Sequence, residues 1–417
     1  MKLDVASLAP KGKRAIEWAE RHMPVLMIIR EEMSKKKPLK GFTVGMTLHV
    51  EAKTAALVRT LVAGGAEVAI SGCNPLSTKD EVAAALIEEG IDTYAWRGQS
   101  EKDYYTNINN VLNHQPDILI DDGADLISMA HTKHPELISK ILGACEETTT
   151  GVNRLRAMAA EDKLKFPVVA VNDTPAKRLF DNRFGTAEST LQGIMSATNT
   201  LIAGKQIVVA GYGFVGRGIA SRAKGLGAVV TVVETDPIRA LEAVMDGFRV
   251  LRMSEAASFG DIFITTTGSI GVIRKEHLVK MKDGAILANA GHFNVEIDIP
   301  ALAKLAVKKR EILDDVEEFQ LRDGRRLYLL AEGRLVNLAG KRSLGHPMEI
   351  MDMSFALQAL SVGYLAKYGK ELEPRVHDVP EEIDRKVAEL KLHSLGIKLE
   401  QHTREQIEYA KSWLLGT

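Results

Sequence analysis

Residues 207–218 read IVVAGYGFVGRG, and this stretch sets the architecture that we expect around it. Strand-forming residues lead into Gly211, Gly213 and Gly216, which fit the spacing G-x-G-x-x-G, and a helical pattern follows over 217–226. In such a unit the first glycine permits a tight turn, the second lets the backbone approach a pyrophosphate, and the third brings the helix close to the strand. The segment predicts a dinucleotide site at a helix N-terminus, although three glycines alone would also fit a turn without a ligand.

An acidic residue closes the next predicted strand. Glu234 ends the run VVTVVE, 23 residues after Gly211. A carboxylate in that place hydrogen-bonds a ribose diol and repels a 2′-phosphate, which favours NAD over NADP. Arg239 could reach a 2′-phosphate, but we expect the charge of Glu234 to prevail and Arg239 to stack on the adenine ring. NAD is therefore the predicted cofactor.

Strands and helices alternate in both directions from this segment. Apolar runs form one set at 206–210, 228–233, 248–251, 261–266 and 285–289, and an earlier set at 42–48, 67–71, 117–121 and 167–171. Helical patterns occur at 11–33, 52–63 and 79–89, and an amphipathic helix at 186–202 links the two sets. Strands rich in Val and Ile that alternate with helices predict parallel sheets covered by helices. We expect two doubly wound, Rossmann-like α/β domains with parallel sheets, followed by a small helical C-terminal segment.

The chain becomes helical again after residue 346. Helical patterns cover 350–367, 380–393 and 403–414, and the first of them is long and apolar. That helix could cross back to the earlier domain, which would make the earlier domain discontinuous.

Composition excludes several classes of protein. The chain has 417 residues, which at roughly 150 residues per domain predicts two or three domains. Lys and Arg total 54 against 55 Asp and Glu, and this balance argues against nucleic acid or an anionic membrane as the main partner. Two cysteines exclude a disulfide scaffold, and no 18-residue apolar stretch or signal-peptide pattern occurs. We expect a cytoplasmic protein.

Polar residues gather where the predicted strands end, which is where open α/β sheets bind ligands. They are His49, Asp121-Asp122-Gly123, EETTTG at 146–151, Asn172-Asp173 with Lys177, Asp181 and Asn182, NAGHF at 289–293, Asn337, and Gly345-His346-Pro347. Each also has a plain structural interpretation; Lys177 and Asp181, for example, could form a surface ion pair on a helix. His131 and His134 lack a third ligand, so we interpret them as surface residues and predict no metal.

The chain resembles the S-adenosylhomocysteine hydrolase family. The match extends from about residue 15 to about residue 410 and rests on DDGADL (121–126), EETTTGV (146–152), VND…K…FDN (171–182), AGYGFVGRG (210–218), FITTTG (263–268), NAGHF (289–293) and AEGRLVNL (331–338). The resemblance implies a tightly bound NAD, oxidation of the nucleoside 3′-hydroxyl, loss of the 4′ proton, expulsion of homocysteine, addition of water at the 5′ carbon and reduction of the ketone. It further implies a small-molecule substrate and a homotetramer.

The resemblance also implies a division of the chain. A substrate-binding domain comprises 1–183 and 348–385, an NAD-binding domain comprises 186–345, and 386–417 forms a C-terminal helical oligomerisation segment.

Roles for individual residues follow from the same resemblance. Lys177 is the base at the 3′-hydroxyl, Asp181 orients it, and a cationic nicotinamide nearby would lower its pKa. His49 and Asp122 handle protons at the 4′ and 5′ positions, and His292 lies over the ribose. The implied substrate contacts are Glu51, Lys53, Thr54, Glu147, Lys177, Asp181 and His346. The implied cofactor contacts are Thr148, Thr149, Thr150, Asn182, Gly211, Gly213, Phe214, Val215, Gly216, Arg217, Gly218, Glu234, Arg239, Ala290, Gly291, His292 and Asn337.

Two residues near His49 depart from the family pattern. Glu51 stands where many members have threonine, and Lys53 stands where many have glutamate. Threonine and glutamate complement adenine, whereas Glu51 as acceptor and Lys53 as donor would complement the ring N–H and the oxygen of hypoxanthine. We hypothesise that S-inosylhomocysteine is accepted, or even preferred; the alternative is that the two residues pair with each other or point outward.

Other departures concern the tail and one loop. The chain ends in WLLGT without the family's Lys and Tyr, which suggests weaker or more exchangeable NAD. The loop 338–346 is about two residues longer than usual, and Gly185 replaces a common cysteine.

Two other functional classes stay open at the level of sequence. A conventional NAD-linked dehydrogenase would explain the glycines but leave EETTT and the earlier domain's polar residues unused. A non-catalytic NAD-binding regulator would not need an intact set of Lys177, Asp181, Asp122, His49 and His292.

Overall fold

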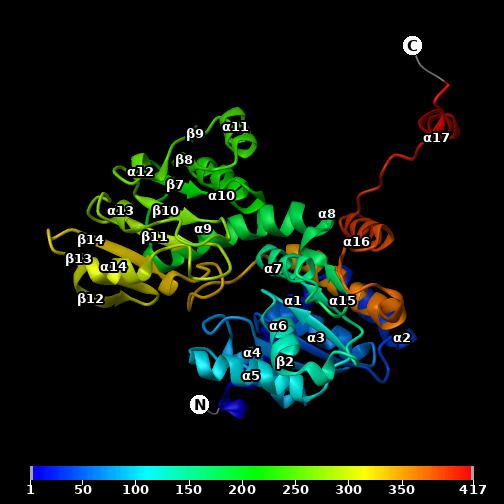
Figure 1. Ribbon diagram of the computed structural model, residues 1–417. Helices are drawn as coiled ribbons and strands as arrows, with labels where there is room; N and C mark the ends of the chain where they lie inside the picture. The colour runs from blue at the N-terminus through cyan, green and yellow to red at the C-terminus, as the bar shows by residue number, and fades with distance from the viewer. Residues whose placement is uncertain (1–2, 415–417) are drawn as a thin grey trace.

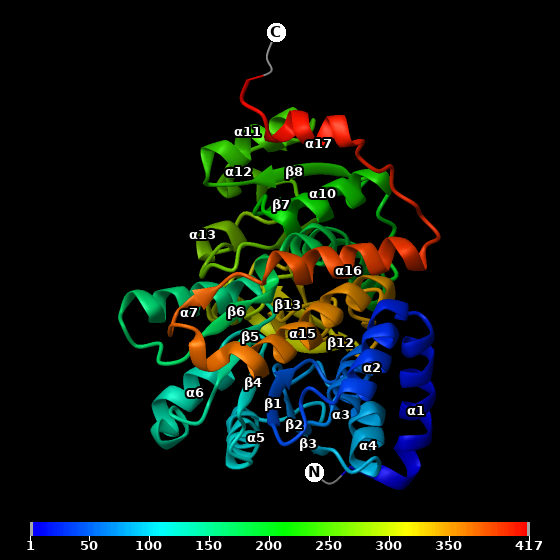
Figure 2. The same cartoon turned by 90° about the vertical axis from the view of Figure 1, so that its right-hand side faces the viewer.

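A computed structural model describes residues 3–414, which form two α/β units, each built on one sheet (Figures 1 and 2). The first sheet has seven strands, all parallel, in the order β15-β6-β5-β4-β1-β2-β3. Its strands are β1 (Thr43–Leu48), β2 (Glu67–Gly72), β3 (Asp92–Tyr94), β4 (Ile118–Asp121), β5 (Gly143–Glu146), β6 (Val168–Ala170) and β15 (Val376–His377). The four strands predicted here are confirmed within two residues at each end, whereas β3 (DTY), β5 (GACE) and β15 (VH) contain too few apolar residues to give an apolar run.

Helices cover both faces of this sheet. They are α1 (Val5–Arg21), α2 (Pro24–Lys36), α3 (Ala52–Ala63), α4 (Asp80–Glu88), α5 (Glu101–Asn113), α6 (Asp125–Lys133), α7 (Thr149–Ala160), α15 (Met348–Tyr368) and α16 (Glu381–Ser394), with short turns η1 (Pro135–Leu137), η2 (Val171–Asp173) and η5 (Gly369–Glu371). Alternate residues of a strand face opposite layers. Ile118 and Ile120 therefore pack with α2, α3 and α15, whereas Leu119 packs with α5 and α6.

The chain returns to the first sheet after residue 346. α15 lies beside α2 and α3, as both views show, and Phe355 and Leu357 join their buried cluster. Asp352, fully buried on α15, accepts hydrogen bonds from the backbone N–H groups of Val25 (3.3 Å) and Leu26 (2.9 Å). This packing accords with the expected crossing, and the division at 183, 186, 345 and 385 stays a prediction.

The second sheet has eight strands in the order β12-β13-β14-β11-β10-β7-β8-β9. They are β7 (Gln206–Ala210), β8 (Val229–Val233), β9 (Arg249–Val250), β10 (Ile262–Thr265), β11 (Ile286–Asn289), β12 (Ala306–Leu313), β13 (Val316–Leu321) and β14 (Arg326–Leu330). All five predicted strands are present and parallel, but β12, β13 and β14 add an antiparallel edge that the sequence analysis missed. β12 carries the charged run KKRE and is mostly exposed, as suits an edge strand, so it lacked the apolar signature of a strand.

The remaining helices mostly surround the second sheet or connect it to the first. They are α8 (Pro175–Lys177), the π-helix η3 (Arg178–Gly185), α9 (Thr186–Thr198), α10 (Phe214–Gly225), α11 (Pro237–Met245), α12 (Met253–Ala256), α13 (Lys275–Leu278), α14 (Ile299–Leu305), η4 (Ala331–Gly333) and α17 (Arg404–Lys411). The predicted linking helix is α9, and it ends four residues early because Asn199 adopts the left-handed conformation. α17 projects away from the body in Figure 1. No described helix is long and apolar enough to cross a membrane.

Candidate active site

One cavity of about 440 Å³ is lined by residues from both sheets. His49, Asp122 and Glu147 follow strands β1, β4 and β5 of the first sheet. Gly211 and Ala290 follow strands β7 and β11 of the second sheet. The cavity therefore lies where the carboxyl ends of the parallel strands of both sheets face each other, which is the ligand-binding edge of such sheets.

The part of the cavity at the second sheet has the geometry of a dinucleotide site. Gly211 has φ +103°, and a side chain there would meet the Thr266 hydroxyl at 2.6 Å. Gly213 caps α10 and leaves open space before the helix N-terminus. Glu234 accepts hydrogen bonds from the backbone N–H groups of Tyr212 (2.7 Å) and Thr235 (2.6 Å) and lines the cavity. A pyrophosphate and a ribose diol fit these groups.

Most of the predicted cofactor residues line this cavity, and three do not. Gly216 and Gly218 lie against the carbonyls of Gly211 and Arg183, so they allow close packing of α10. Arg217 pairs with Glu242 outside the cavity. The lining residues are Thr148, Thr149, Thr150, Asn182, Gly211, Gly213, Phe214, Val215, Glu234, Arg239, Ala290, Gly291, His292 and Asn337.

Lys177 lies at the start of the π-helix and is 4% exposed. Its Nζ lies 2.8 Å from Asn182 Oδ1, 3.3 Å from Asp181 Oδ1 and 3.5 Å from Glu147 Oε1. Burial lowers the pKa of Lys177, but the carboxylates of Asp181 and Glu147 outweigh burial and raise it. The interpretation as a surface ion pair is therefore wrong, and the carboxylates oppose the lowered pKa that we expect beside a nicotinamide. π-Helices of this kind are frequent at functional sites.

The two carboxylates beside Lys177 differ in their charge state. Burial raises the pKa of Asp181, but Lys177 and His346 hold it well below its usual range, and the Ser354 hydroxyl donates to its Oδ2 at 2.8 Å. Burial raises the pKa of Glu147 to about 8 against the opposing effect of Lys177. Gln358 donates to Glu147 at 2.5 Å. One fixed anion and one carboxyl that readily holds a proton thus lie on either side of the amine.

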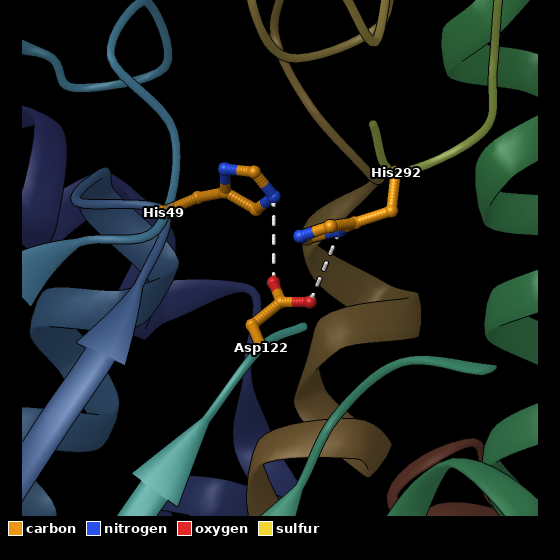
Figure 3. A group of neighbouring side chains, drawn as sticks. All are labelled: His49, Asp122 and His292. Carbon is orange, nitrogen blue, oxygen red and sulfur yellow. Dashed lines mark ion pairs between the residues drawn. The ribbon is translucent and has the colours of Figure 1, made fainter. Parts of the chain in front are cut away.

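A second acid–base group joins the two sheets (Figure 3). His49 Nε2 lies 3.4 Å from Asp122 Oδ2, and His292 Nδ1 lies 3.6 Å from Asp122 Oδ1. His49 Nδ1 also hydrogen-bonds the Ser77 hydroxyl at 2.7 Å. Burial lowers the pKa of His49 to about 4, so its imidazole is neutral near pH 7 and can accept a proton. The three side chains are brought together only when both sheets are in place.

Glycine at position 123 permits this approach. Gly123 has φ +110°, and a Cβ there would lie 2.5 Å from His292 Nε2. The DDG sequence thus supplies both the carboxylate and the space for the histidine above it.

The donor set of this group also suits a cation. One atom each of His49, Asp122 and His292 lie within 4.8 Å of one another, and imidazole and carboxylate are ligands that zinc accepts. The histidine pair that stands out in the sequence is His131 and His134 instead. His131 Nδ1 lies 2.8 Å from the Ile127 carbonyl and its Nε2 accepts from the Lys165 N–H at 3.0 Å, so that ring has no free nitrogen. The absence of a metal stays a prediction.

Glu51 and Lys53 form an ion pair at the cavity wall. Lys53 Nζ lies 2.8 Å from Glu51 Oε2 and donates to the Leu344 carbonyl at 3.0 Å. Thr54 donates to the His49 carbonyl at 2.6 Å, and His346 Nδ1 lies 3.1 Å from Asp181 Oδ1. All four line the cavity, so the pair of Glu51 and Lys53 faces the ligand space even though its members bind each other.

Several lining residues were not proposed from the sequence. The motif FITTTG gave a signal for Thr266, Thr267 and Gly268, whereas α15 gave none because its long apolar run predicts only a buried helix. The unpredicted residues with a polar or aromatic side chain are Asn153, Thr186, Tyr212, Thr235, Asp236, Thr266, Thr267, Ser269 and Phe355.

The fold and the cavity define a class of protein, an NAD-binding enzyme whose acid–base groups lie between two α/β sheets. Residues 2–134 match the sequence family described as S-adenosyl-L-homocysteine hydrolase, and residues 182–343 match that family's NAD-binding domain. The chain belongs to this family, so the predicted family, hydrolase class and NAD cofactor are confirmed.

Relatives carry either of two names. The chain is 64% identical to the S-inosyl-L-homocysteine hydrolase of Methanopyrus kandleri, over 99% of this chain and 97% of that protein. It is 59% identical to the adenosylhomocysteinase of Sulfurisphaera tokodaii and 58% identical to the S-inosyl-L-homocysteine hydrolase of Methanocaldococcus jannaschii, in both cases over 99% of this chain and 98% of the relative.

Proposed function

We propose that the protein catalyses the reversible hydrolysis of the thioether between homocysteine and the 5′ carbon of a purine nucleoside, either S-adenosyl- or S-inosyl-L-homocysteine. One observation carries the proposal: a buried lysine and a His–Asp–His group line the same cavity as the dinucleotide site. The names of the relatives support it. A thioether at an unactivated alkyl carbon resists water, so a transient 3′-ketone is needed to acidify the 4′ proton.

Lys177 and its neighbours act at the 3′ position. Bound NAD would supply a reversible hydride acceptor for C3′. A cationic nicotinamide would lower the pKa of Lys177 against the effect of its carboxylates, so that the neutral amine can take the hydroxyl proton. Asp181 fixes the amine, and Glu147 holds the ribose diol. A positioned base of this kind contributes roughly 10²–10⁴-fold to the rate.

His49, Asp122 and His292 act at the 4′ and 5′ positions. The neutral imidazole of His49 and the carboxylate of Asp122 take the 4′ proton and return it to C4′, and they pass the proton lost by the attacking water to the departing homocysteine thiolate. His292 comes from the second sheet, so it completes this group only when the two sheets enclose the substrate.

The redox state of the bound cofactor during turnover tests the proposal. Holoenzyme is mixed rapidly with each thioether, and NADH absorbance is followed together with thiol release. We expect NADH to appear transiently and return to baseline as thiol accumulates. NADH that accumulates with turnover indicates a conventional dehydrogenase, and neither signal indicates a regulator.

We propose further that S-inosylhomocysteine is accepted, because Glu51 and Lys53 face the cavity with an acceptor and a donor. The two side chains also form an ion pair with each other, so a purine base would have to compete with that pair for their hydrogen bonds. The double variant Glu51→Thr/Lys53→Glu should shift the ratio of kcat/KM toward the adenosyl substrate. The variant Lys37→Gln, on an exposed surface, lowers the net charge by the same single unit and is the matched charge control. An unchanged ratio would show that the pair is structural.

We propose that the enzyme is a cytoplasmic homotetramer with the domain division given above. Apolar side chains on α11 support an interface, because Ile238 is 72% exposed and Met245 is 76% exposed. On the projecting C-terminal segment, Ile407 and Trp413 are 44% and 90% exposed. The ending WLLGT covers residues 413–417, of which 415–417 lie outside the described residues. Light scattering should give four chains, and truncation after Gly396 should give fewer; an intact protein that is monomeric would contradict the proposal.

A further inference from the structure

Glu146 is fully buried at the end of β5 and does not line the cavity, yet it bonds both loops that carry site residues. Its Oε1 accepts hydrogen bonds from the backbone N–H groups of Gly123 (2.9 Å) and Thr148 (3.0 Å). Gly123 directly follows Asp122, and Thr148 directly follows Glu147. A single carboxyl oxygen therefore joins the backbone beside Asp122 to the backbone beside Glu147.

From this arrangement we propose that Glu146 is a positioning residue that sets the mutual placement of Asp122 and Glu147. The proposal rests on the function proposed above, in which Glu147 holds the ribose and Asp122 moves protons at the neighbouring carbons. Gly123 is also in close contact with His292. A shift of the Gly123 backbone would therefore disturb site residues from both sheets.

The surroundings of Glu146 form a closely fitted pocket for the carboxyl group. Gly151, in the first turn of α7, packs directly against this carboxyl group. A Cβ atom at Gly151 would lie 2.6 Å from Glu146 Oε2. Asp121 is the register partner of Glu146 on β4, and its own carboxyl accepts from the N–H groups of Asp122 (2.9 Å) and Ile127 (2.8 Å). The Asp121 carboxyl thus fixes the loop after β4, and the Glu146 carboxyl joins that loop to the loop after β5.

Glu146 acts in its uncharged form. No Lys or Arg among residues 3–414 forms an ion pair with Glu146 or Asp121, and Glu146 Oε2 is buried without a hydrogen-bond partner in that part of the chain. Burial, and then Asp121 and Asp122, raise the pKa of Glu146 well above its usual range. Burial also raises the pKa of Asp121 to about 8. The titratable groups that face Glu146 are these acids, so a proton rather than a cation neutralises it.

The test compares three substitutions at this position with wild-type holoenzyme. Glu146→Gln keeps an uncharged acceptor of the same length, so we expect it to retain most of the activity. Glu146→Asp cannot reach both N–H groups, and Glu146→Ala reaches neither. We expect each of these two to lower kcat by about 10²-fold, as misplacement of about 1 Å can do. The effect on KM should be smaller, and both the transient NADH and thiol release should slow.

Asp352→Asn is the control, because Asp352 is a buried carboxylate that caps the α2 backbone away from the cavity. It should lower the unfolding temperature without the kcat loss. An inactive Glu146→Gln with a normal unfolding temperature and NAD content would overturn the proposal, and so would a fully active Glu146→Asp. If Glu146→Ala does not fold, the other two variants decide. Failure of wild-type protein to release thiol would instead refute the proposed function.

Discussion

At the scale of single residues, the site consists of ordinary side chains whose properties are set by burial. The anions beside Lys177 favour its charged form, which a cationic nicotinamide would oppose, and burial favours the neutral form of His49. The residue types at these positions were predictable from the family resemblance. Their charge states were not, since they depend on Glu147, Ser354 and Gln358, which come from distant parts of the chain.

Replacement of Lys177 tests its role as the base. Lys177→Met should lower kcat by about 10²–10⁴-fold, because the 3′-hydroxyl proton then has no positioned acceptor. NAD content should stay near wild type, since the contacts to the dinucleotide part remain. Steady-state kinetics and released cofactor measure the two effects, with the exposed Lys163→Met as control. A loss of less than tenfold would argue that another group takes the proton.

The lowered pKa of His49 predicts a dependence of stability on pH. The histidine takes up a proton near pH 6.5 in the unfolded chain and near pH 4 in the folded protein. Between these pH values the unfolded state binds more protons than the folded state. His49 therefore makes the free energy of unfolding decrease as the pH decreases from 6.5 to 4. In His49→Asn, the free energy of unfolding from urea titrations should fall less steeply over this range. Parallel curves for both proteins would contradict the assigned pKa.

At the scale of secondary structure, the sequence predicts elements well where an apolar run of full length exists. β7 and α3 begin and end where their patterns do. The π-helix over Arg178–Gly185 was not predicted, because its wider turn leaves no mark in the spacing of apolar residues. The antiparallel edge at β12 was missed because charged residues occupy it.

Close packing of α10 makes a prediction for its glycines. Gly218 lies against the Arg183 carbonyl of the π-helix, so Gly218→Ala should destabilise the protein by about 1–3 kcal/mol through overpacking. It should also weaken NAD binding, because α10 presents its N-terminus to the cofactor. Gly225→Ala is the matched control on the same helix, as no atom lies within 4 Å of its Cβ position. Equal urea midpoints for the two variants would contradict this packing argument.

At the scale of the whole molecule, the two sheets are held together around the cavity by cations of the first sheet's loops. Arg97 donates to the Ala339 carbonyl at 2.7 Å, and Lys79 donates to the Ser343 carbonyl at 2.8 Å. These bonds fix the loop that the sequence analysis recognised as longer than usual. The hydrogen-bond partners of this loop were not predictable from the sequence, because they depend on how the two sheets face each other.

Thiol release by NAD-loaded protein tests the central claim most directly. S-adenosyl- and S-inosylhomocysteine are supplied side by side, and homocysteine thiol is counted against bound NAD. We predict many equivalents of thiol per NAD without net NADH, and faster release from the inosyl substrate. Faster release from the adenosyl substrate would keep the chemistry and make the pair of Glu51 and Lys53 structural. No thiol from either substrate would contradict the assignment of a hydrolytic site between the two sheets.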